Sequence, residues 1–199
     1  MRALLAACAL LYGFPALAAT ASPAPVLPGD SVYQLDARLT DSAGRALAWR
    51  DLRGQPRIAT MFYTSCRYIC PLVVDSLRAI ERQLTPPERG RIGFVLVSMD
   101  PERDTPAALA GVQVERKLDV SRWTLLQPRP DDLRGIAGIL GIRYRALADG
   151  EFNHSTALVL LDADGRVLAR TDRLGADADP GFMEAVRKAA AVSGSASGR

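Results

Sequence analysis

The sequence predicts an α/β sandwich, in which a central, mostly parallel sheet carries antiparallel hairpin strands at one side and helices on both faces. Strand-like and helix-like segments alternate through the middle of the chain, as in strand–helix–strand units with parallel strands. Residues 92–99 are almost continuously apolar, which is typical of a strand buried on both faces of a parallel sheet. Turn sequences at residues 41–44 and 162–165 each separate two extended runs, which favours hairpins.

The first half of the chain supplies one hairpin and one strand–helix unit. Residues 33–49 contain the two extended runs of that hairpin. Residues 57–63 form an apolar strand that leads directly towards Cys66. Apolar residues recur at helical spacing from Pro71 onward, and the two prolines at 86–87 are expected to end this helix.

The second half continues the alternation and ends in a second hairpin and a helix. Thr105 is a suitable N-cap and Pro106 a suitable first-turn residue, so a helix is expected to begin there. The remaining elements are a strand at 123–126, a helix at 131–140 closed by Gly141, extended runs at 155–161 and 166–171, and a closing helix at 182–192.

The N-terminus is predicted to be a secretory signal peptide, residues 1–19. Arg2 precedes an apolar run that ends in the small-residue pattern at 16–18, as such leaders do. The run of seventeen residues is at the short limit for a membrane span, and Gly13 and Pro15 weaken it as a helix. An uncleaved N-terminal anchor is the alternative.

One globular domain, residues 31–192, is expected after the leader. Removing 19 of the 199 residues leaves 180, a usual size for a single domain, and the apolar and charged fractions are ordinary. Residues 20–30 are rich in Pro, Ala and Ser and predict a flexible linker, whereas residues 193–199 predict a disordered polar tail.

Charge and cysteine content bear on the partners and the compartment. The net charge of +3 falls to +2 when the leader, which contains one Arg, is removed. The remaining arginines are interspersed with acidic residues, so no nucleic-acid partner is expected.

Cys8 ends a sequence that resembles a lipoprotein cleavage site, but too little apolar sequence precedes it, and we expect Cys8 to be lost with the leader. Two cysteines then remain in an exported protein, either periplasmic or membrane-anchored and facing the periplasm, where a disulfide is one stable state.

Cys66 and Cys70 are four residues apart, and His154 is the one histidine of the chain. Because residues four apart share a face of a helical turn, the two thiols can meet, either as a disulfide or as thiolates that grip one soft metal ion. His154 would complete a Cys2His site. Cys70 is expected to begin a helix, whose dipole and free amides favour thiolate, and Arg67 adds positive charge nearby.

The alternatives to a metal site are a structural disulfide between the two cysteines and an ordinary surface histidine. A disulfide between Cys66 and Cys70 would close a very short loop, and short loops stabilise least in the chain-entropy model. His154 taken alone would more often be a surface or strand-edge residue. Which of these interpretations holds depends on whether the three side chains converge.

Several motifs at matching distances carry a resemblance to a known family. They are Cys-x-x-x-Cys-Pro between a strand and a helix, the run Val-Ser-Met-Asp-Pro-Glu-Arg-Asp-Thr-Pro at 97–106, Asn-His-Ser at 153–155 before a strand, and Asp-Ala-Asp-Gly at 162–165. Over about residues 35–182 the chain therefore resembles the Sco/SenC family.

The resemblance implies a thioredoxin-like fold and a copper site. Copper, as Cu(I) or Cu(II), would be held by Cys66, Cys70 and His154 and delivered to the dinuclear copper centre of cytochrome c oxidase. The implied partners are the copper-site subunit of that oxidase, a copper donor and a thiol reductant. The chain departs from the family pattern at residues 67–69, Arg-Tyr-Ile, where an acidic pair is usual; this removes no ligand but affects partner choice, metal affinity and redox potential.

Three further points follow from the residues. Asp100, at the end of the buried strand, is expected to support the site or to dock a partner, the alternative being an ordinary turn residue before proline.

The alternative function is that of a thiol–disulfide oxidoreductase acting on the cysteines of a copper-site protein, with Cys66 and Cys70 as the redox pair. Such enzymes, however, usually have two residues between their cysteines. A thiol peroxidase fits less well, because Thr64 lies only two residues before Cys66.

Overall fold

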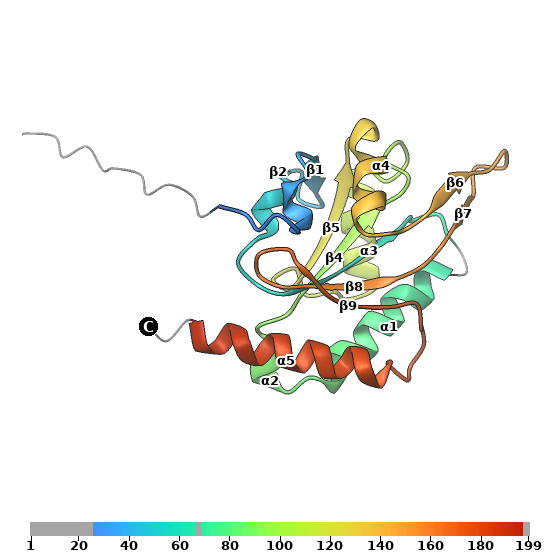
Figure 1. Ribbon diagram of the computed structural model, residues 1–199. Helices are drawn as coiled ribbons and strands as arrows, with labels where there is room; N and C mark the ends of the chain where they lie inside the picture. The colour runs from blue at the N-terminus through green and yellow to red at the C-terminus, as the bar shows by residue number, and fades with distance from the viewer. Residues whose placement is uncertain (1–25, 67–68, 197–199) are drawn as a thin grey trace, which may run out of the picture.

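The computed structural model of the protein describes residues 26–66 and 69–196, and it has the predicted α/β architecture (Figure 1). The predicted leader, most of the linker, Arg67 and the last three residues lie outside the described residues. The strands are β1 (Arg38–Asp41), β2 (Ala46–Ala48), β3 (Arg57–Phe62), β4 (Gly93–Ser98), β5 (Trp123–Pro128), β6 (Tyr144–Ala146), β7 (Phe152–His154), β8 (Leu158–Leu161) and β9 (Val167–Thr171).

Seven of these strands form one mixed sheet in the order β2-β1-β5-β4-β3-β8-β9. At the centre of the sheet, β4 runs parallel to β3 on one side and to β5 on the other. Every residue of β4 is buried, as its apolar run predicts. Strands β1 and β8 join this centre antiparallel, and each continues into a hairpin partner. Antiparallel hairpins therefore lie at both edges of the sheet rather than at one side, because short turns join the extended runs near both ends of the chain.

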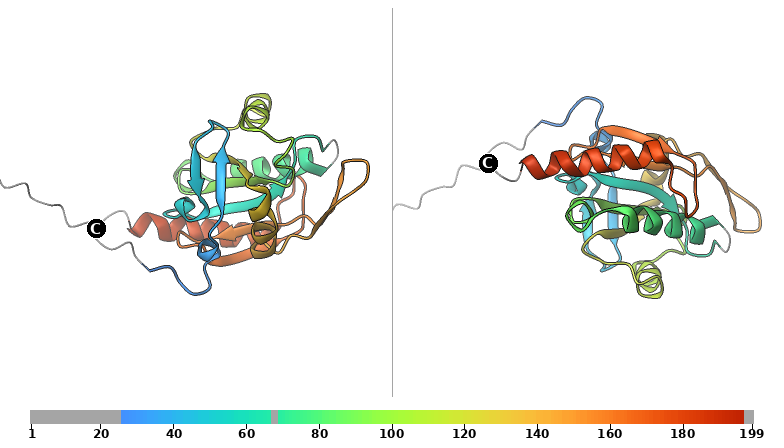
Figure 2. Two further views of the ribbon diagram at one scale, coloured as in Figure 1. Left: turned by 90° about the horizontal axis from the view of Figure 1, so that it is seen from above. Right: turned by 90° about the horizontal axis from the view of Figure 1, so that it is seen from below.

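Helices cover both faces of the sheet (Figure 2). The α-helices are α1 (Ile69–Gln83), α2 (Pro86–Arg89), α3 (Pro106–Glu115), α4 (Pro130–Ile139) and α5 (Pro180–Ala196), and the 3-10 helices are η1 (Val32–Gln34) and η2 (Trp49–Leu52). Helices α1 and α5 lie side by side on one face, α4 lies on the other, and α3 packs against β5.

Three helix boundaries differ from those expected. Helix α1 is described from Ile69, so Pro71 lies in the first turn of the described helix, where a missing N–H costs no intrahelical hydrogen bond. The prolines at 86–87 begin α2 instead of marking the end of α1, because Thr85 and Glu88 cap that short helix. Helix α5 continues to Ala196, so most of the predicted tail at 193–199 is helical.

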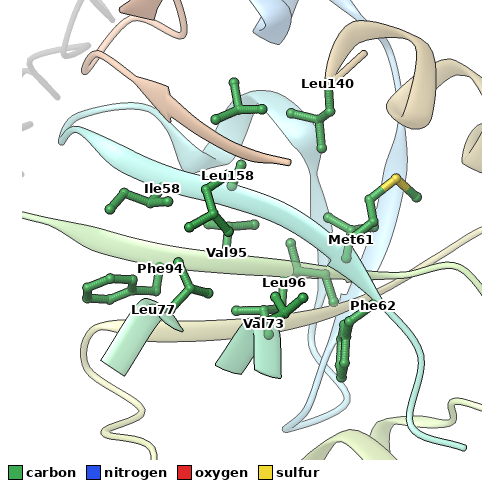
Figure 3. Packing of buried hydrophobic residues seen from close by; sticks show 14 of the residues in the cluster. Ile58, Met61, Phe62, Val73, Leu77, Phe94, Val95, Leu96, Leu140 and Leu158 are labelled. Carbon is green, nitrogen blue, oxygen red and sulfur yellow. The ribbon is translucent and has the colours of Figure 1, made fainter. Parts of the chain in front are cut away.

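The core joins α1 to the centre of the sheet (Figure 3). Val73 and Leu77 of α1 are fully buried against one face, and Leu140 is fully buried on the opposite face. Burying a side chain of this size stabilises the folded state by about 1.5–3 kcal/mol. The connection between β3 and α1, where the cysteines lie, is therefore held at both ends by elements packed in the core.

Strands β6 and β7 form a separate two-stranded hairpin that the sequence patterns did not predict. It projects from the end of the molecule where α1 begins, far from both ends of the described chain (Figure 1). Its strands are three residues long and none of their residues is fully buried, so they lack a clear alternation of buried apolar and exposed polar residues. The extended run expected at 155–161 accordingly becomes strand only at Leu158, and His154 belongs to the hairpin.

No helix within the described ranges is long and apolar enough to cross a membrane.

Candidate metal centre

The two cysteines lie at the connection between β3 and α1. Cys66 follows the turn after Tyr63, and Cys70 lies in the first turn of α1; both are reduced thiols, 8% and 4% exposed. The Cys70 amide donates a hydrogen bond to Cys66 Sγ at 3.3 Å, and the Tyr63 amide donates to Cys70 Sγ at 3.4 Å. The spacing of four thus brings the thiols together as predicted, with a backbone N–H directed at each sulfur.

The protonation of Cys70 differs from the expectation. Burial raises the pKa of the Cys70 thiol, the neighbouring Cys66 and Asp104 raise it further, and the hydrogen bond from the Tyr63 amide only partly offsets this. The low pKa expected at a helix start is therefore wrong for Cys70, because desolvation outweighs the helix amides. The Cys70 thiol must lose this proton before it can bind a metal ion as thiolate.

His154 ends β7 and is half-buried beside Tyr63. The two rings meet edge to face with centroids 5.9 Å apart. The Nδ1 atom of His154 lies 3.2 Å from the carbonyl oxygen of Ser155. A carbonyl only accepts, so this contact needs the proton on Nδ1 and leaves Nε2 as the nitrogen available to a metal ion.

The three predicted ligands are not assembled in this structure. Within the described part of the chain, no group of three His, Cys, Asp or Glu side chains is close enough to hold a metal ion. Cys66 and Cys70 are together, whereas His154 stands on the hairpin, beside the Tyr63 ring. A Cys2His site therefore requires the hairpin to move relative to the cysteines.

Tyr63 is a site residue that the sequence patterns missed. Its hydroxyl donates a hydrogen bond to Glu151 Oε2 at 2.7 Å, and its ring packs edge to face on Phe152 at 5.0 Å. Burial raises the pKa of Tyr63, and hydrogen bonds with Glu151 and with Cys66 raise it further. Tyr63 thus touches both the cysteine pair and the hairpin.

Asp100 supports the hairpin rather than the cysteines. Its buried carboxylate accepts a hydrogen bond from Arg103, and the guanidinium of Arg103 also donates to the carbonyl oxygen of Gly150, in the turn of the hairpin. The role expected for Asp100, support of the metal site or docking of a partner, stays a prediction. Arg67, the other residue expected to modulate the site, lies outside the described residues.

Asp104 is a second residue that the sequence patterns missed, although it belongs to the same motif as Asp100. It is fully buried and accepts hydrogen bonds from the Thr64 amide at 3.1 Å, from the Thr64 hydroxyl and from the Ser98 hydroxyl. Burial raises the pKa of Asp104, and its hydrogen bonds oppose this. Asp104 therefore ties the turn before Cys66 to the end of β4.

A cleft of about 170 Å³ opens onto the cysteine pair from the side of α1 and α3. Val74 and Val112 form part of its wall, and Glu115 contributes a charged group. The lining residues do not include His154. The thiols can therefore be approached from a side other than that of the hairpin.

Fold and site together define the class of the protein. A thioredoxin-like sheet that presents two adjacent thiols at a strand–helix junction, with one imidazole nearby, is a dithiol centre suited to a soft metal ion such as copper. The profile of the SCO1/SenC family matches residues 29–190, and the chain belongs to this family.

Individual relatives agree with the family assignment. The chain is 37% identical over 141 residues to the mitochondrial SCO2 homolog of Bos taurus, a match that covers 68% of this chain and 52% of the bovine protein. The matched region covers 52% of the bovine protein and 63% of a second relative, a copper-binding protein of Stutzerimonas stutzeri, which is less than two thirds of either protein.

Solved structures share the fold. The copper-bound ScoI of Bradyrhizobium japonicum has a TM-score of 0.63 and 22% identity, over 81% of this chain and 97% of that one. BsSco, described as a member of a family of cytochrome c oxidase assembly proteins and as having a disulfide switch, has a TM-score of 0.66 and 19% identity, over 78% and 92%. A SCO1/SenC family lipoprotein from Bacillus anthracis has a TM-score of 0.66 and 22% identity, over 78% and 92%. The family thus includes copper-bound proteins and a lipoprotein.

Proposed function

We propose that this protein is an exported copper carrier that delivers copper to the dinuclear copper centre of cytochrome c oxidase. The observation that carries the proposal is the meeting of Cys66 and Cys70 in a SCO1/SenC chain, with His154 on a neighbouring hairpin. Copper is the cargo, and its release is part of the function. The proposed partners are the copper-site subunit of the oxidase, a copper donor and a thiol reductant that keeps the cysteines reduced.

The donor set suits reversible copper binding. Two thiolates and one imidazole satisfy the soft Cu(I) ion in a three-coordinate site, and they are also acceptable to Cu(II). Three protein ligands leave room for a ligand of the acceptor to enter. Because Cys66 and Cys70 are already adjacent, we expect them to capture the ion first, and His154 to close the site when the hairpin moves.

The experiment measures copper bound per chain in fully reduced protein. We expect one copper ion per chain, a markedly weaker affinity in His154→Ala, and little change in the control Asn153→Ala, which removes an exposed side chain from the same strand. A copper affinity and absorption spectrum that are unchanged in His154→Ala would contradict the ligand assignment.

A second function, reduction of a partner's disulfide, is favoured by one observation. The thiols of Cys66 and Cys70 are adjacent and line a cleft that a partner can enter. Cys66 and Cys70 would form a disulfide as the partner's disulfide takes up two electrons and two protons to become two thiols. In the disulfide form neither sulfur is a thiolate, so we expect oxidised protein to bind copper far more weakly than reduced protein.

We further propose that the chain acts outside the cytoplasm, either free in the periplasm or held at the membrane by its N-terminal segment. The leader-like residues 1–19 support this location. Mass spectrometry of the protein from the producing cell would distinguish a cleaved from a retained N-terminus.

A further inference from the structure

The hairpin of β6 and β7 needs contacts with the body of the protein to have a defined position. It is not part of the seven-stranded sheet, and its two strands pair over only three residues each. A two-stranded ribbon of this size is marginal in water without packing partners. Whatever holds the hairpin therefore also determines where His154 stands.

Tyr63 makes a continuous set of contacts with this hairpin. Its hydroxyl donates to Glu151, its ring packs against Phe152, and the same ring meets the imidazole of His154. Arg103 adds one further connection, to the carbonyl oxygen of Gly150. Among the hydrogen bonds and ring contacts of the described residues, Tyr63 thus makes most of those that join the second half of the hairpin to the body, while Phe152 also packs against the core.

Tyr63 itself is firmly placed. It directly follows β3, is 3% exposed, and its amide is bound to Cys70 Sγ. Its hydroxyl and its ring face the hairpin, where they meet Glu151 and Phe152. Tyr63 therefore connects the cysteine pair, through its amide, to the hairpin that carries His154, through its side chain.

We propose that Tyr63 is a positioning residue for His154, and that the hydrogen bond from its hydroxyl to Glu151 keeps the hairpin within reach of the cysteine pair. The inference rests on the proposed function, in which Cys66, Cys70 and His154 bind copper. Without the hydroxyl the hairpin samples more positions, so the effective concentration of the imidazole at the two thiols falls. The two cysteines keep their own geometry.

The test is a double-mutant cycle on copper affinity. Cu(I) affinity is measured in fully reduced protein, by competition with a chromophoric chelator, for the wild type, Tyr63→Phe, His154→Ala and the double variant. Tyr63→Phe retains the ring and loses only the hydroxyl. We expect about a tenfold weaker affinity in Tyr63→Phe, the size expected for one hydrogen bond to a charged group. In the His154→Ala background we expect no further loss.

Three additional measurements separate positioning from general destabilisation. Glu151→Gln should weaken copper binding in the same direction as Tyr63→Phe. Tyr144→Phe is the matched control, because Tyr144 also packs near Phe152 but its hydroxyl has no hydrogen bond among the described residues. In Cu(II)-loaded protein, the nitrogen hyperfine coupling in the electron paramagnetic resonance spectrum should diminish in Tyr63→Phe and remain in Tyr144→Phe.

The outcomes are distinct. Equal losses on Tyr63→Phe in the presence and absence of His154 would overturn the proposal, as would an unchanged or tighter affinity in Tyr63→Phe, and in both cases the copper-carrier function would stand. An unchanged affinity in His154→Ala would overturn the ligand assignment and the proposal together.

Discussion

The two cysteines lie in a firmly packed region of the molecule, whereas the histidine lies in a weakly packed one. Cys66 and Cys70 lie where a buried strand connects to a packed helix, and backbone amides are directed at both sulfurs. His154 ends a short, largely exposed hairpin outside the main sheet. Under the proposed carrier function, this difference would let the protein both hold and release copper: two ligands would be organised in advance, and the third would move with the hairpin.

The largest effect is expected when the organised half of the site loses a ligand. Cys70→Ser should lower copper affinity by at least about a hundredfold, because changes in groups behind the ligands alone cost 10–100-fold. Chelator competition in reduced protein measures this loss. Ser76→Ala in the same helix is the control, since its hydroxyl bonds the Leu72 carbonyl and touches neither thiol. Equal affinities in Cys70→Ser and wild type would mean that copper binds elsewhere.

A second expected difference is in stability. Leu77→Ala, in the core beneath the sheet, should lower the free energy of unfolding by about 2–5 kcal/mol, because it leaves a cavity in close packing. Tyr144→Ala, at the half-buried position of the otherwise exposed strand β6, should lower it by less than about 1 kcal/mol. Urea denaturation followed by circular dichroism compares them. Similar losses for the two variants would show that the hairpin is as much a part of the folding unit as the core.

The smallest predicted effect is a pH dependence from Asp104. Burial raises the pKa of Asp104 in the folded state, so the native protein binds this proton more tightly than the unfolded chain. The contribution of Asp104 to stability therefore falls as pH rises from about 3.9, the ordinary Asp pKa, through its raised value. Asp104→Asn should lack this fall, which unfolding measured between pH 4 and pH 7 would reveal.

Asp132 provides the matched control for this measurement. Its hydrogen bonds with Arg129 hold the pKa of its carboxyl below the usual range, so its contribution is present at neutral pH and lost as pH falls. Asp132→Asn should therefore change the pH profile with the opposite sign. A profile for Asp104→Asn that is parallel to that of the wild type would contradict the assignment.

The features that sequence patterns predicted are local ones. The buried strand at 92–99 and the spacing of Cys66 and Cys70 each have a signature within a few residues, and both are confirmed. The family motifs led to the right fold and family. The proposed roles of Cys66, Cys70 and His154 as ligands remain predictions.

The features that were missed depend on contacts between distant residues. Tyr63 meets Glu151 across 88 positions, and Asp104 meets Thr64 across 40. No local pattern encodes such a meeting, and the hairpin that carries Glu151 has strands too short and too polar for an alternating signal. The raised pKa of Cys70 has the same origin, because its burial comes from the assembled fold rather than from its place at a helix start.

Two fixed thiolates, of Cys66 and Cys70, and the mobile imidazole of His154 are proposed to bind one copper ion. X-ray absorption at the copper edge of loaded, reduced protein tests this proposal most directly. We expect two sulfur ligands and one nitrogen ligand in the wild type, and two sulfur ligands without the protein nitrogen in His154→Ala. A first shell that is identical in the two proteins, or one with fewer than two sulfur ligands in the wild type, would contradict the account.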